Sequence, residues 1–442
     1  MIGQAAKAGL FTALLVLAGC ANQDTILVGE RLDLRDGSVL GGSIAEIPEN
    51  RTVDISLGNP VSRDAWTMTG SGRLHNAGHN AFTRDVPALV WKSPIGQGET
   101  RKLRLTVDPV AAQGLVVAMD AEARLTAVSA SSGEVVWSVD LTTVGEKAAG
   151  VSGGALAISG DVLYATSGFG DLVALDLKTG GELWRQRLNA VGAAGLNVYD
   201  GLIYVVAGDG QVWAVNTSDG RVKWQLSGPE TVTSRVGAAS PAVTDRIAVL
   251  PFASGDIYGV FRKGGLRLWS ASIAGQRQGV VYANVSDITS DPVIVGNTMY
   301  VGNQAGRYAA FELEGGTRLW TADEGAYSPA SVVGGSLFIV TDRNELVRLS
   351  ARTGERIWGV QLPLYTKQRE RQRKSVFAHY GPIAAGGKIW VASNDGWLRG
   401  FDPASGTQVA RVELPKGAAS DPIVVGGVMY VLLEDGSLAA LR

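Results

Sequence analysis

The sequence predicts an all-β protein, an eight-bladed β-propeller with four-stranded antiparallel blades and a ring closed by an N-terminal strand. Three observations carry this prediction. A unit of short alternating strands and glycine turns recurs along most of the 442 residues. Most copies of the unit reach a tryptophan at the same place. One strand without a partner precedes the first copy, whereas the last copy lacks a strand.

The recurring unit is clearest at Gly160–Trp184, which reads GDVLYATSGFGDLVALDLKTGGELW. It contains a short alternating strand, a turn with glycine, a second alternating strand, an Asp/Thr/Gly turn and a third strand that reaches the tryptophan. A single copy cannot bury its own apolar face, so neighbouring copies must stack and the ring must close. The same pattern recurs in Gly201–Trp224, Asn297–Trp320 and Gly335–Trp358.

Eight repeat cores follow one another along the chain. Six of them reach a tryptophan four residues after a glycine, whereas the seventh has Ala410 at this place. The eighth stops at Arg442 and lacks its own last strand. The cores begin near Leu115, Val162, Leu202, Arg246, Thr298, Ser336, Lys388 and Val428, and first strands of blades are visible at 239–243, 290–296, 381–387 and 420–427.

The strand Val86–Lys92, which contains Trp91, supplies the missing piece in this prediction. Its pairing with the C-terminal copy leaves no open sheet edge at that joint. Residues 86–442 then provide roughly 45 residues for each blade, which suits four strands.

The repeated tryptophans are predicted to dock between blades. An indole buries roughly 150–250 Å² and so fixes the spacing and angle of two blades. The Asp or Asn before the turn (Asp176, Asn216) can bind the backbone two residues on, and the glycine supplies a positive φ. The pattern is therefore architectural and indicates little about chemistry. The predicted docking residues are Trp91, Trp137, Trp184, Trp224, Trp269, Trp320 and Trp358.

The first residues, MIGQAAKAGLFTALLVLAGC, predict a lipoprotein signal peptide over 1–19 and lipid attachment at Cys20. Lys7 gives a minimal positive start, and the apolar stretch that follows is too short to span a bilayer. The letters LAGC are similar to a bacterial lipobox; the alternative is an ordinary signal peptide with an incidental cysteine. Residues 20–85 then form the lipidated N-terminus and a mostly extended tether, and the propeller occupies 86–442.

The composition excludes several classes of function. With 40 basic and 42 acidic residues, the chain lacks the basic surface of a non-specific nucleic-acid binder. One cysteine excludes an intrachain disulfide and a cysteine metal cluster. His75 and His79 have the spacing of a helical metal pair, but Asn76 and Gly78 disfavour a helix, and a local turn packed on the ring is the alternative. No nucleophile motif or phosphate loop occurs, so neither catalysis nor a cofactor is expected.

The residues of the repeat now allow a family resemblance to be stated. Ala174, Asp176, Thr179, Gly180 and Trp184 resemble the tryptophan-docking motif of pyrroloquinoline-quinone-type propellers. A lipobox followed by an eight-bladed ring of this type resembles the BamB family, propeller lipoproteins of the bacterial outer-membrane β-barrel assembly (BAM) machinery. The resemblance covers nearly the whole chain. It implies a non-catalytic scaffold that aids β-barrel folding and insertion.

The resemblance also implies partners. It points to a BamA-like barrel assembly protein, bound through its POTRA domains, and to attachment by lipid to the periplasmic face of the outer membrane. Ala21, rather than Asp, follows Cys20, which agrees with the outer membrane. Other BAM lipoproteins and unfolded outer-membrane proteins are left open as further partners. No nucleic-acid partner is expected.

Two loops match the family's partner-binding pattern. In TVTSRVGAASPAV the match places an arginine at Arg235 and apolar contacts at Val232 and Val236. In NVSDITSDP it places Ser286 and Asp287. The second acid of the family pattern is replaced here by Thr289, and Asp291 is nearby but displaced. Solvated loop charges are the alternative for Arg235 and Asp287.

Two other functions remain to be weighed against the scaffold. A quinoprotein-like dehydrogenase resembles the chain in fold, but such enzymes typically have adjacent cysteines beside the quinone, and the single cysteine excludes that pair. A glycan- or peptidoglycan-binding propeller could use Trp213, Trp390 and Trp397 if they were exposed, although such residues often pack within strands.

The stretch Tyr365–Phe377, YTKQRERQRKSVF, is an insertion with five cations and a single Glu370. It lengthens the interval from Trp358 to Ala410 to 52 residues, so it is predicted to protrude as a loop or short helix. A solvated loop and an electrostatic contact with acidic protein or lipid headgroups are the two alternatives. The cations are Lys367, Arg369, Arg371, Arg373 and Lys374.

Overall fold

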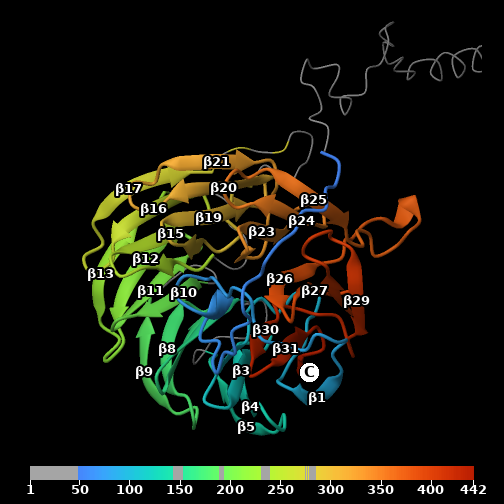
Figure 1. Ribbon diagram of the computed structural model, residues 1–442. Helices are drawn as coiled ribbons and strands as arrows, with labels where there is room; N and C mark the ends of the chain where they lie inside the picture. Colours follow the sequence, from blue (N-terminus) through green and yellow to red (C-terminus); the bar gives the residue numbers. More distant parts are fainter. Residues whose placement is uncertain are drawn as a thin grey trace, which may run out of the picture. The chain divides into compact units, whose positions relative to one another are not determined.

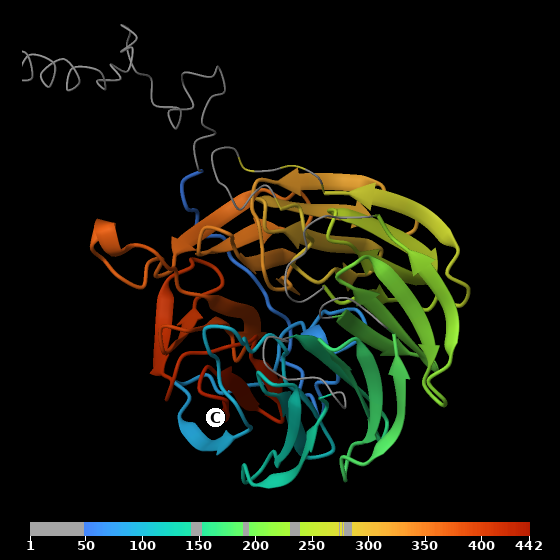
Figure 2. The same ribbon diagram turned by 180° about the vertical axis from the view of Figure 1, so that it is seen from behind.

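The computed structural model confirms the eight-bladed propeller. Its part from Pro48 to Arg442 forms one compact unit, in which eight four-stranded antiparallel sheets are arranged in a ring (Figures 1 and 2). In the part of the chain that the structure describes, no helix is both long and apolar enough to cross a membrane. The described residues are 48–142, 153–188, 194–229, 239–273, 275, 277 and 285–442.

Each blade is an antiparallel meander whose first strand lies innermost and whose fourth strand lies at the rim. The burial of the strands follows this order, since second and third strands are almost wholly buried, whereas fourth strands alternate with solvent. Blades 1 to 4 consist of β2 (Val110–Ala112), β3 (Leu115–Met119), β4 (Arg124–Ser129), β5 (Val135–Asp140); β6 (Gly154–Ser159), β7 (Val162–Ser167), β8 (Asp171–Asp176), β9 (Glu182–Arg187); β10 (Ala194–Tyr199), β11 (Leu202–Ala207), β12 (Gln211–Asn216), β13 (Val222–Ser227); and β14 (Ala242–Val243), β15 (Ile247–Pro251), β16 (Asp256–Phe261), β17 (Arg267–Ser272).

The second strands begin where the sequence predicts, with a difference of one residue at β15. Two short 3-10 helices are described, η1 (Thr69–Ser71) and η3 (Glu370–Gln372). Blades 5 to 8 consist of β18 (Val293–Val295), β19 (Thr298–Asn303), β20 (Arg307–Glu312), β21 (Arg318–Ala322); β22 (Ser331–Val333), β23 (Ser336–Val340), β24 (Glu345–Ser350), β25 (Arg356–Gln361); β26 (His379–Ala385), β27 (Lys388–Ser393), β28 (Trp397–Phe401), β29 (Gln408–Glu413); and β30 (Ile423–Val425), β31 (Val428–Leu433), β32 (Ser437–Leu441), β1 (Leu89–Pro94).

The N-terminal strand closes the ring, as the sequence predicts. β1 pairs antiparallel with β32, with Trp91 opposite Ala440 and Pro94 opposite Ser437. The pairing extends to the last residue, because the backbones of Ala88 and Arg442 exchange two hydrogen bonds of 2.9 Å. Blade 8 is therefore built from both ends of the propeller's chain.

Each of the seven repeated tryptophans reaches into the next blade. The indole N–H donates to a backbone carbonyl of that blade at 2.9–3.3 Å. A β-bulge lies one residue from each of these tryptophans. The pairs are Trp91 to Ala130, Trp137 to Leu177, Trp184 to Thr217, Trp224 to Arg262, Trp269 to Leu313, Trp320 to Ala351 and Trp358 to Pro403.

The face of each indole lies directly on a glycine of the next blade. These glycines have φ between 69 and 75° in the turn between third and fourth strands, and a Cβ there would approach the indole to 2.4–2.8 Å. Glycine is therefore required twice over, for the left-handed backbone and for the close approach. The glycines are Gly133, Gly180, Gly220, Gly265, Gly316, Gly354 and Gly406.

The joint between blades 7 and 8 has no such contact. Ala410 stands at the tryptophan position of β29, and the space beside it is filled by Trp390 of β27, which is fully buried. In five other blades the position of Trp390 holds a tyrosine or phenylalanine that packs against the docking indole, for example Tyr204 against Trp224. At this joint the large aromatic side chain is therefore on the second strand instead of the fourth. The indole of Trp390 makes an edge-to-face contact with Phe82.

The hydrophobic core is distributed between blades. In the described residues, buried apolar side chains form seven clusters, and each of them joins neighbouring blades. The largest joins blades 7, 8 and 1 and includes Trp66 from the segment before β1. Each blade therefore needs its neighbours to bury its two faces.

Residues 48–85, which we call the strap, cross the ring before β1 begins. The sequence indicated packing on the ring only for a turn at His75 and His79, whereas the contacts of the strap run along most of its length. Figure 1 shows this blue segment crossing the middle of the ring. The strap contacts every blade, through hydrogen bonds between Trp66 and Ala111, Thr67 and Ile158, Arg73 and Asn197, Arg73 and Val243, Leu74 and Ile294, Val53 and Arg348, Asn80 and Ala384, and Arg63 and Gly426.

The indole–glycine contact predicts a specific coupling in blades 2 and 3. Gly220→Ala should destabilise the protein by about 1–3 kcal/mol more than Gly201→Ala. Both positions have positive φ (70 and 76°), but only Gly220 faces an indole, that of Trp184 at 2.7 Å, whereas nothing lies within 4 Å of a Cβ at Gly201. In a Trp184→Ala chain, which should itself lose about 3–5 kcal/mol, this difference should vanish. Urea unfolding of the four variants measures the coupling, and a difference that persists without the indole would contradict it.

The strap should contribute to the stability of the ring. Trp66→Ala should cost about 3–5 kcal/mol, because this indole is 4% exposed and belongs to the largest core cluster. Val61→Ala is the control, since Val61 is in the same segment but 51% exposed, and it should change stability by less than about 0.5 kcal/mol. Thermal melts compare the two variants. A strap that serves only as a tether would make both changes equally neutral.

Candidate functional site

The loops between the fourth strand of one blade and the first strand of the next emerge at one end of the ring. The turns between second and third strands lie at the same end, because alternate strands of a meander run in the same direction. We call this end the loop face; its described parts include 252–255, 285–292, 323–330, 341–344 and 362–378. The sequence places the predicted partner-binding residues here.

The predicted partner-binding residues differ in how the structure describes them. Val232, Arg235 and Val236 lie outside the described residues. Ser286 is half-buried, whereas Asp287 and Asp291 are only 4% and 9% exposed. The two carboxylates therefore offer little surface to a partner.

The bases of the two predicted loops are joined. The backbone N–H of Ser240, which follows the first loop, donates to Oδ1 of Asp291 at 2.7 Å, although the two residues are 51 apart in sequence. The second loop also lies on blade 4, because the N–H of Ile288 donates to the carbonyl of Phe252 at 3.4 Å. The two loops thus begin side by side, and Asp291 holds their bases together.

An arginine on the same face spans a whole blade. Arg277, which follows β17 of blade 4, forms a bidentate ion pair with Asp342 of blade 6, with Nε–Oδ2 and Nη2–Oδ1 distances of 3.1 Å. On the way it crosses blade 5, where its backbone N–H donates to Ala305 and its Nη2 donates to the carbonyl of Asp323. The Asp342 side chain is fully buried, so the pair is shielded from salt. This clamp fixes the loop face across three blades.

A second group of charges lies beside this clamp. Arg356 pairs with Glu324 at 2.8 Å and with Glu345 at 3.2 Å, and Arg343 contacts the same two carboxylates at 3.5 and 3.2 Å. Burial raises the pKa of Glu324, although Arg356 and Arg343 act in the opposite direction. The group joins the loop after β21 to blade 6 and is structural, since both carboxylates face inward.

Carboxylates also link the blades around the central channel. Asp108, Asp291 and Asp421 each precede the proline before the first strand of their blade. Oδ1 of Asp421 accepts hydrogen bonds from the Gly381 N–H at 2.7 Å and from Oγ of Ser328 at 2.8 Å. The Asp421 N–H donates in turn to Oδ1 of Asp108 at 3.0 Å. Blades 6, 7, 8 and 1 are connected in this way.

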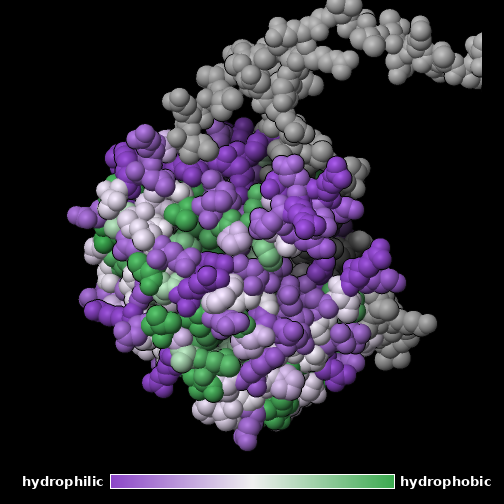
Figure 3. All heavy atoms as spheres, turned by 90° about the vertical axis from the view of Figure 1, so that its right-hand side faces the viewer, coloured by the Kyte–Doolittle hydropathy of each residue, from purple (hydrophilic) through white to green (hydrophobic). Residues whose placement is uncertain are grey.

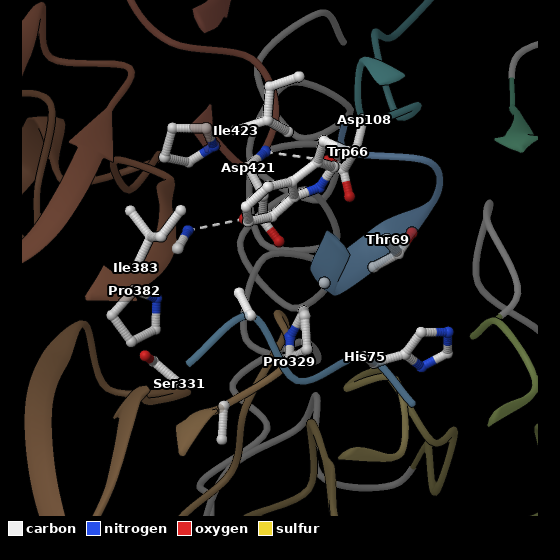
Figure 4. A pocket seen from close by; sticks show the side chains of 15 residues that line it. Trp66, Thr69, His75, Asp108, Pro329, Ser331, Pro382, Ile383, Asp421 and Ile423 are labelled. Atoms are coloured by element: carbon white, nitrogen blue, oxygen red, sulfur yellow. Dashed lines mark hydrogen bonds between the residues drawn. The ribbon is translucent and has the colours of Figure 1, made fainter. Parts of the chain in front are cut away.

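Between these carboxylates and the strap lies a small cavity of about 40 Å³. Figure 4 shows Asp108, Asp421 and Trp66 converging on it, with Thr69 and His75 on the strap side. Burial raises the pKa of Asp108 well above its ordinary value, and the nearby charges of Asp421 and Asp291 add to the effect. The cavity holds little more than a water molecule, so it does not form a substrate pocket.

The histidines of the strap have structural partners. His75 is buried, its Nδ1 lies 3.0 Å from the carbonyl of Pro292, and burial lowers its pKa to about 4. His79 lies between the carbonyl of Gly58 and the N–H of Gly387. In the described part of the chain, no group of three or more His, Cys, Asp or Glu is arranged to hold a metal ion.

The aromatic residues considered for glycan binding are mostly inside the blades. Trp213 is 5% exposed and Trp390 is fully buried. Trp397 is half-buried, and the guanidinium of Arg411 covers its ring at 3.5 Å from the centroid. None of the three presents a free platform for a sugar.

Two features of the loop face escaped the sequence analysis. The Arg277–Asp342 pair joins residues 65 apart, and neither residue has a distinctive neighbourhood in the sequence. The sequence did contain a pattern that marks the channel carboxylates. Asp-Pro recurs before first strands at Asp108, Asp291 and Asp421. Equivalent positions of a closed ring converge on its axis, so this repetition could have predicted their proximity.

The fold and its docking contacts define a class, the eight-bladed propellers with pyrroloquinoline-quinone-type repeats. Within this class the chain belongs to the family described as outer membrane protein assembly factor BamB, whose model matches residues 80–149, 121–360 and 367–442. Most of the strap lies before the matched part.

Individual relatives are distant in sequence but similar over most of their length. The chain is 24% identical to outer membrane protein assembly factor BamB of Yersinia pestis over 360 residues, which cover 80% of this chain and 88% of the relative. It is 23% identical to the protein of the same name in Escherichia coli K12 over 403 residues, covering 82% and 90%.

Solved structures show the same fold. The crystal structure of BamB from Moraxella catarrhalis is matched with a TM-score of 0.67 at 17% identity, covering 81% of this chain and all of that one. The quinohemoprotein alcohol dehydrogenase from Comamonas testosteroni gives a TM-score of 0.66 at 11% identity, covering 87% and 81%. At these identities the likeness concerns the fold, which assembly factors and dehydrogenases share.

Asp108→Asn should make thermal stability less dependent on pH. Because the pKa of Asp108 is raised above 3.8 in the folded chain, its contribution to stability is present at low pH and is lost as the pH rises through the raised pKa. Asparagine keeps the Oδ1 acceptor for the Asp421 N–H and carries no charge. The change in Tm between about pH 5 and about pH 8 should therefore be smaller in the variant. The exposed Asp209→Asn is the control, and an equal change in both variants would contradict the assignment.

Proposed function

We propose that the protein is a non-catalytic, lipid-anchored scaffold of the outer-membrane protein assembly (BAM) machinery. In this proposal it binds the POTRA domains of a BamA-like partner and aids β-barrel folding and insertion. The membership of the BamB family, matched over nearly the whole ring, is the observation that carries the proposal. The relatives from Yersinia pestis and Escherichia coli are both named assembly factors.

The proposed interface is formed by the two adjacent loops of blades 3 to 5. Arg235 would pair with a partner carboxylate, and Val232 and Val236 would provide the desolvated centre that strong contacts need. The hydrogen bond from Ser240 to Asp291 supports the proposal, because it brings the base of this loop beside that of Ser286.

The three acidic and polar residues of the second loop take different parts in this proposal. Ser286 is the described residue with an accessible side chain, so we assign it to the contact. The burial of Asp287 and Asp291 suits residues that position the loops from below. In this proposal Asp287 and Asp291 affect partner binding indirectly, because they set the conformation of the loops that carry the contact residues.

The anchor is proposed at Cys20, after removal of residues 1–19. The mature chain then faces the periplasm from the outer membrane. Several acyl chains hold a protein firmly at a membrane, whereas one is marginal. The lipidated N-terminus and tether are proposed over 20–85, of which the strap, residues 48–85, contacts the ring.

The alternatives receive less support. A dehydrogenase shares the fold, but family membership lies with the assembly factors. Glycan binding would need exposed aromatic residues, and the three considered are buried or covered. A cofactor is not part of the proposal.

Arg235→Ala should weaken binding to purified BamA POTRA domains by about 2 kcal/mol or more, which is roughly thirtyfold. The reason is that a truncated arginine in a desolvated interface leaves its partner carboxylate unpaired. Surface-immobilised POTRA domains and the soluble mature chain, with Cys20 replaced by serine, allow the measurement.

Arg221→Ala is the matched control, because this exposed arginine lies in a turn at the opposite end of the ring. It should bind like the unaltered chain, and both variants should keep the original Tm. Unchanged affinity of the Arg235→Ala, Ser286→Ala double variant would move the interface away from these loops.

A further inference from the structure

The loop 362–378, which follows β25 and contains the insert Tyr365–Phe377, projects from the ring. Figure 1 shows it as an orange hairpin that stands clear of the blades. Its base is fixed, because Nε2 of His379 lies 2.8 Å from the carbonyl of Pro363 and Nδ2 of Asn344 donates to the carbonyl of Phe377 at 2.8 Å. A bridge between Tyr365 and Val376 continues the hairpin outward. The insert is thus an ordered projection with a firm base.

The tip of the insert carries a concentrated positive charge. All residues from 366 to 376 are exposed, and five of them are cations, against one Glu370. Within the described part of the chain, none of these five cations forms an ion pair. The guanidinium of Arg373 lies over the ring of Tyr365 at 5.0 Å, and its Nε donates to the carbonyl of Gln368 at 3.2 Å. The family match is interrupted at 361–366, at the base of this projection.

The start of the described chain lies on the same strand that leads into the insert. The Arg51 N–H donates to the carbonyl of Ile357, and the side chain of Asn50 exchanges two hydrogen bonds of 2.9 Å with the backbone of Gly359, further along β25. From Arg51 back to Asn50 the strap therefore runs toward the end of β25 at which the insert begins. Figure 3, which views the side from which the insert projects, shows a surface that is mainly hydrophilic.

This geometry places the membrane near the insert if the chain is anchored at Cys20, so the inference rests on that part of the proposed function. Cys20 precedes Pro48 by 28 residues. A chain of this length spans at most about 100 Å even when it is fully extended. The lipid surface that holds the anchor would thus lie within reach of the five cations.

We propose that the insert is a second membrane contact, in which its five cations bind the phosphate headgroups of an anionic lipid surface. Each cation near such a surface gains from the negative potential, and the gain falls within a Debye length. The described chain begins beside the end of β25 from which the insert projects. An anchor at Cys20 and the insert would therefore together orient the ring with its loop face toward the membrane. An acidic protein segment is the competing ligand. The short separation of Cys20 from Pro48 and the contact of Asn50 with β25 favour the lipid.

The test uses the soluble mature chain with Cys20→Ser, so that binding does not depend on acylation. Vesicles of phosphatidylcholine with about one-third phosphatidylglycerol should sediment with this protein, whereas pure phosphatidylcholine vesicles should not. Replacing Lys367, Arg369, Arg371, Arg373 and Lys374 by glutamine should lower the partition coefficient about tenfold or more and remove its salt dependence.

The control variant removes the same charge from the opposite end of the ring, by glutamine at the exposed Lys178, Arg221, Lys223, Lys263 and Arg352. It should bind anionic vesicles like the unaltered chain, and melting curves should match for all three proteins. Equal loss in both variants would indicate a general charge effect and overturn the proposal. Binding to an immobilised polyglutamate peptide without binding to anionic vesicles would overturn it in favour of an acidic protein ligand.

The proposed function and this inference fail separately. Fractionation of cells that express the Cys20→Ser chain tests the lipid anchor, since loss of the lipid should release the protein from the outer membrane. Vesicle binding by the unacylated chain tests only the contact of the insert with anionic lipid. A chain that is anchored in cells but does not bind anionic vesicles would reject the insert's contact and leave the scaffold proposal standing.

Discussion

The ring depends on one repeated contact, the face of an indole on a glycine of the following blade. The contact sets the distance between blades at seven joints, and three features of the sequence serve it: the glycine in the turn, the bulge beside the tryptophan and the carbonyl that accepts the indole N–H. Where the contact is missing, between blades 7 and 8, other interactions replace it. Trp390 fills the space from the second strand, Phe82 of the strap packs on it, and the carboxylate of Asp421 links the backbones of the two blades.

The fold could be predicted because its determinants are local and recur. The second strands, the glycine turns and the tryptophans repeat at similar intervals, and the unpaired strand at Trp91 complements the incomplete last copy. The strap could not be predicted in this way. It meets the first strands mainly through backbone hydrogen bonds, such as those of Trp66 with Ala111, and backbone contacts leave no pattern of residue types. The sequence gives no signal for the ion pair of Arg277 with Asp342 either, because the pair depends on which loops the ring brings together.

The candidate site was predicted in part. Resemblance to the family placed Ser286 and Asp287 in the loop before β18. It could not indicate that Asp287 is buried, because burial depends on the loop's packing against blade 4. Asp291, taken as a displaced acid, has a role of its own in joining two loops. The loop face therefore combines a framework of buried ion pairs with loops whose outward side chains are free to vary. The ring by itself does not determine the function, because an assembly factor and a dehydrogenase share the fold.

The pairing of β1 with β32 has a consequence for the order of events during biogenesis. Lys92 and Ala439 face each other across this pair although they are 347 residues apart in the sequence. During synthesis the N-terminus emerges first, so β1 and the strap stay without their ring partners until the final residues have been synthesised. Until then the edge of β1 is open to wrong partners, and the strap has no complete ring to cross. Loss of only the last few residues would therefore act on the first strand of the propeller as much as on the last.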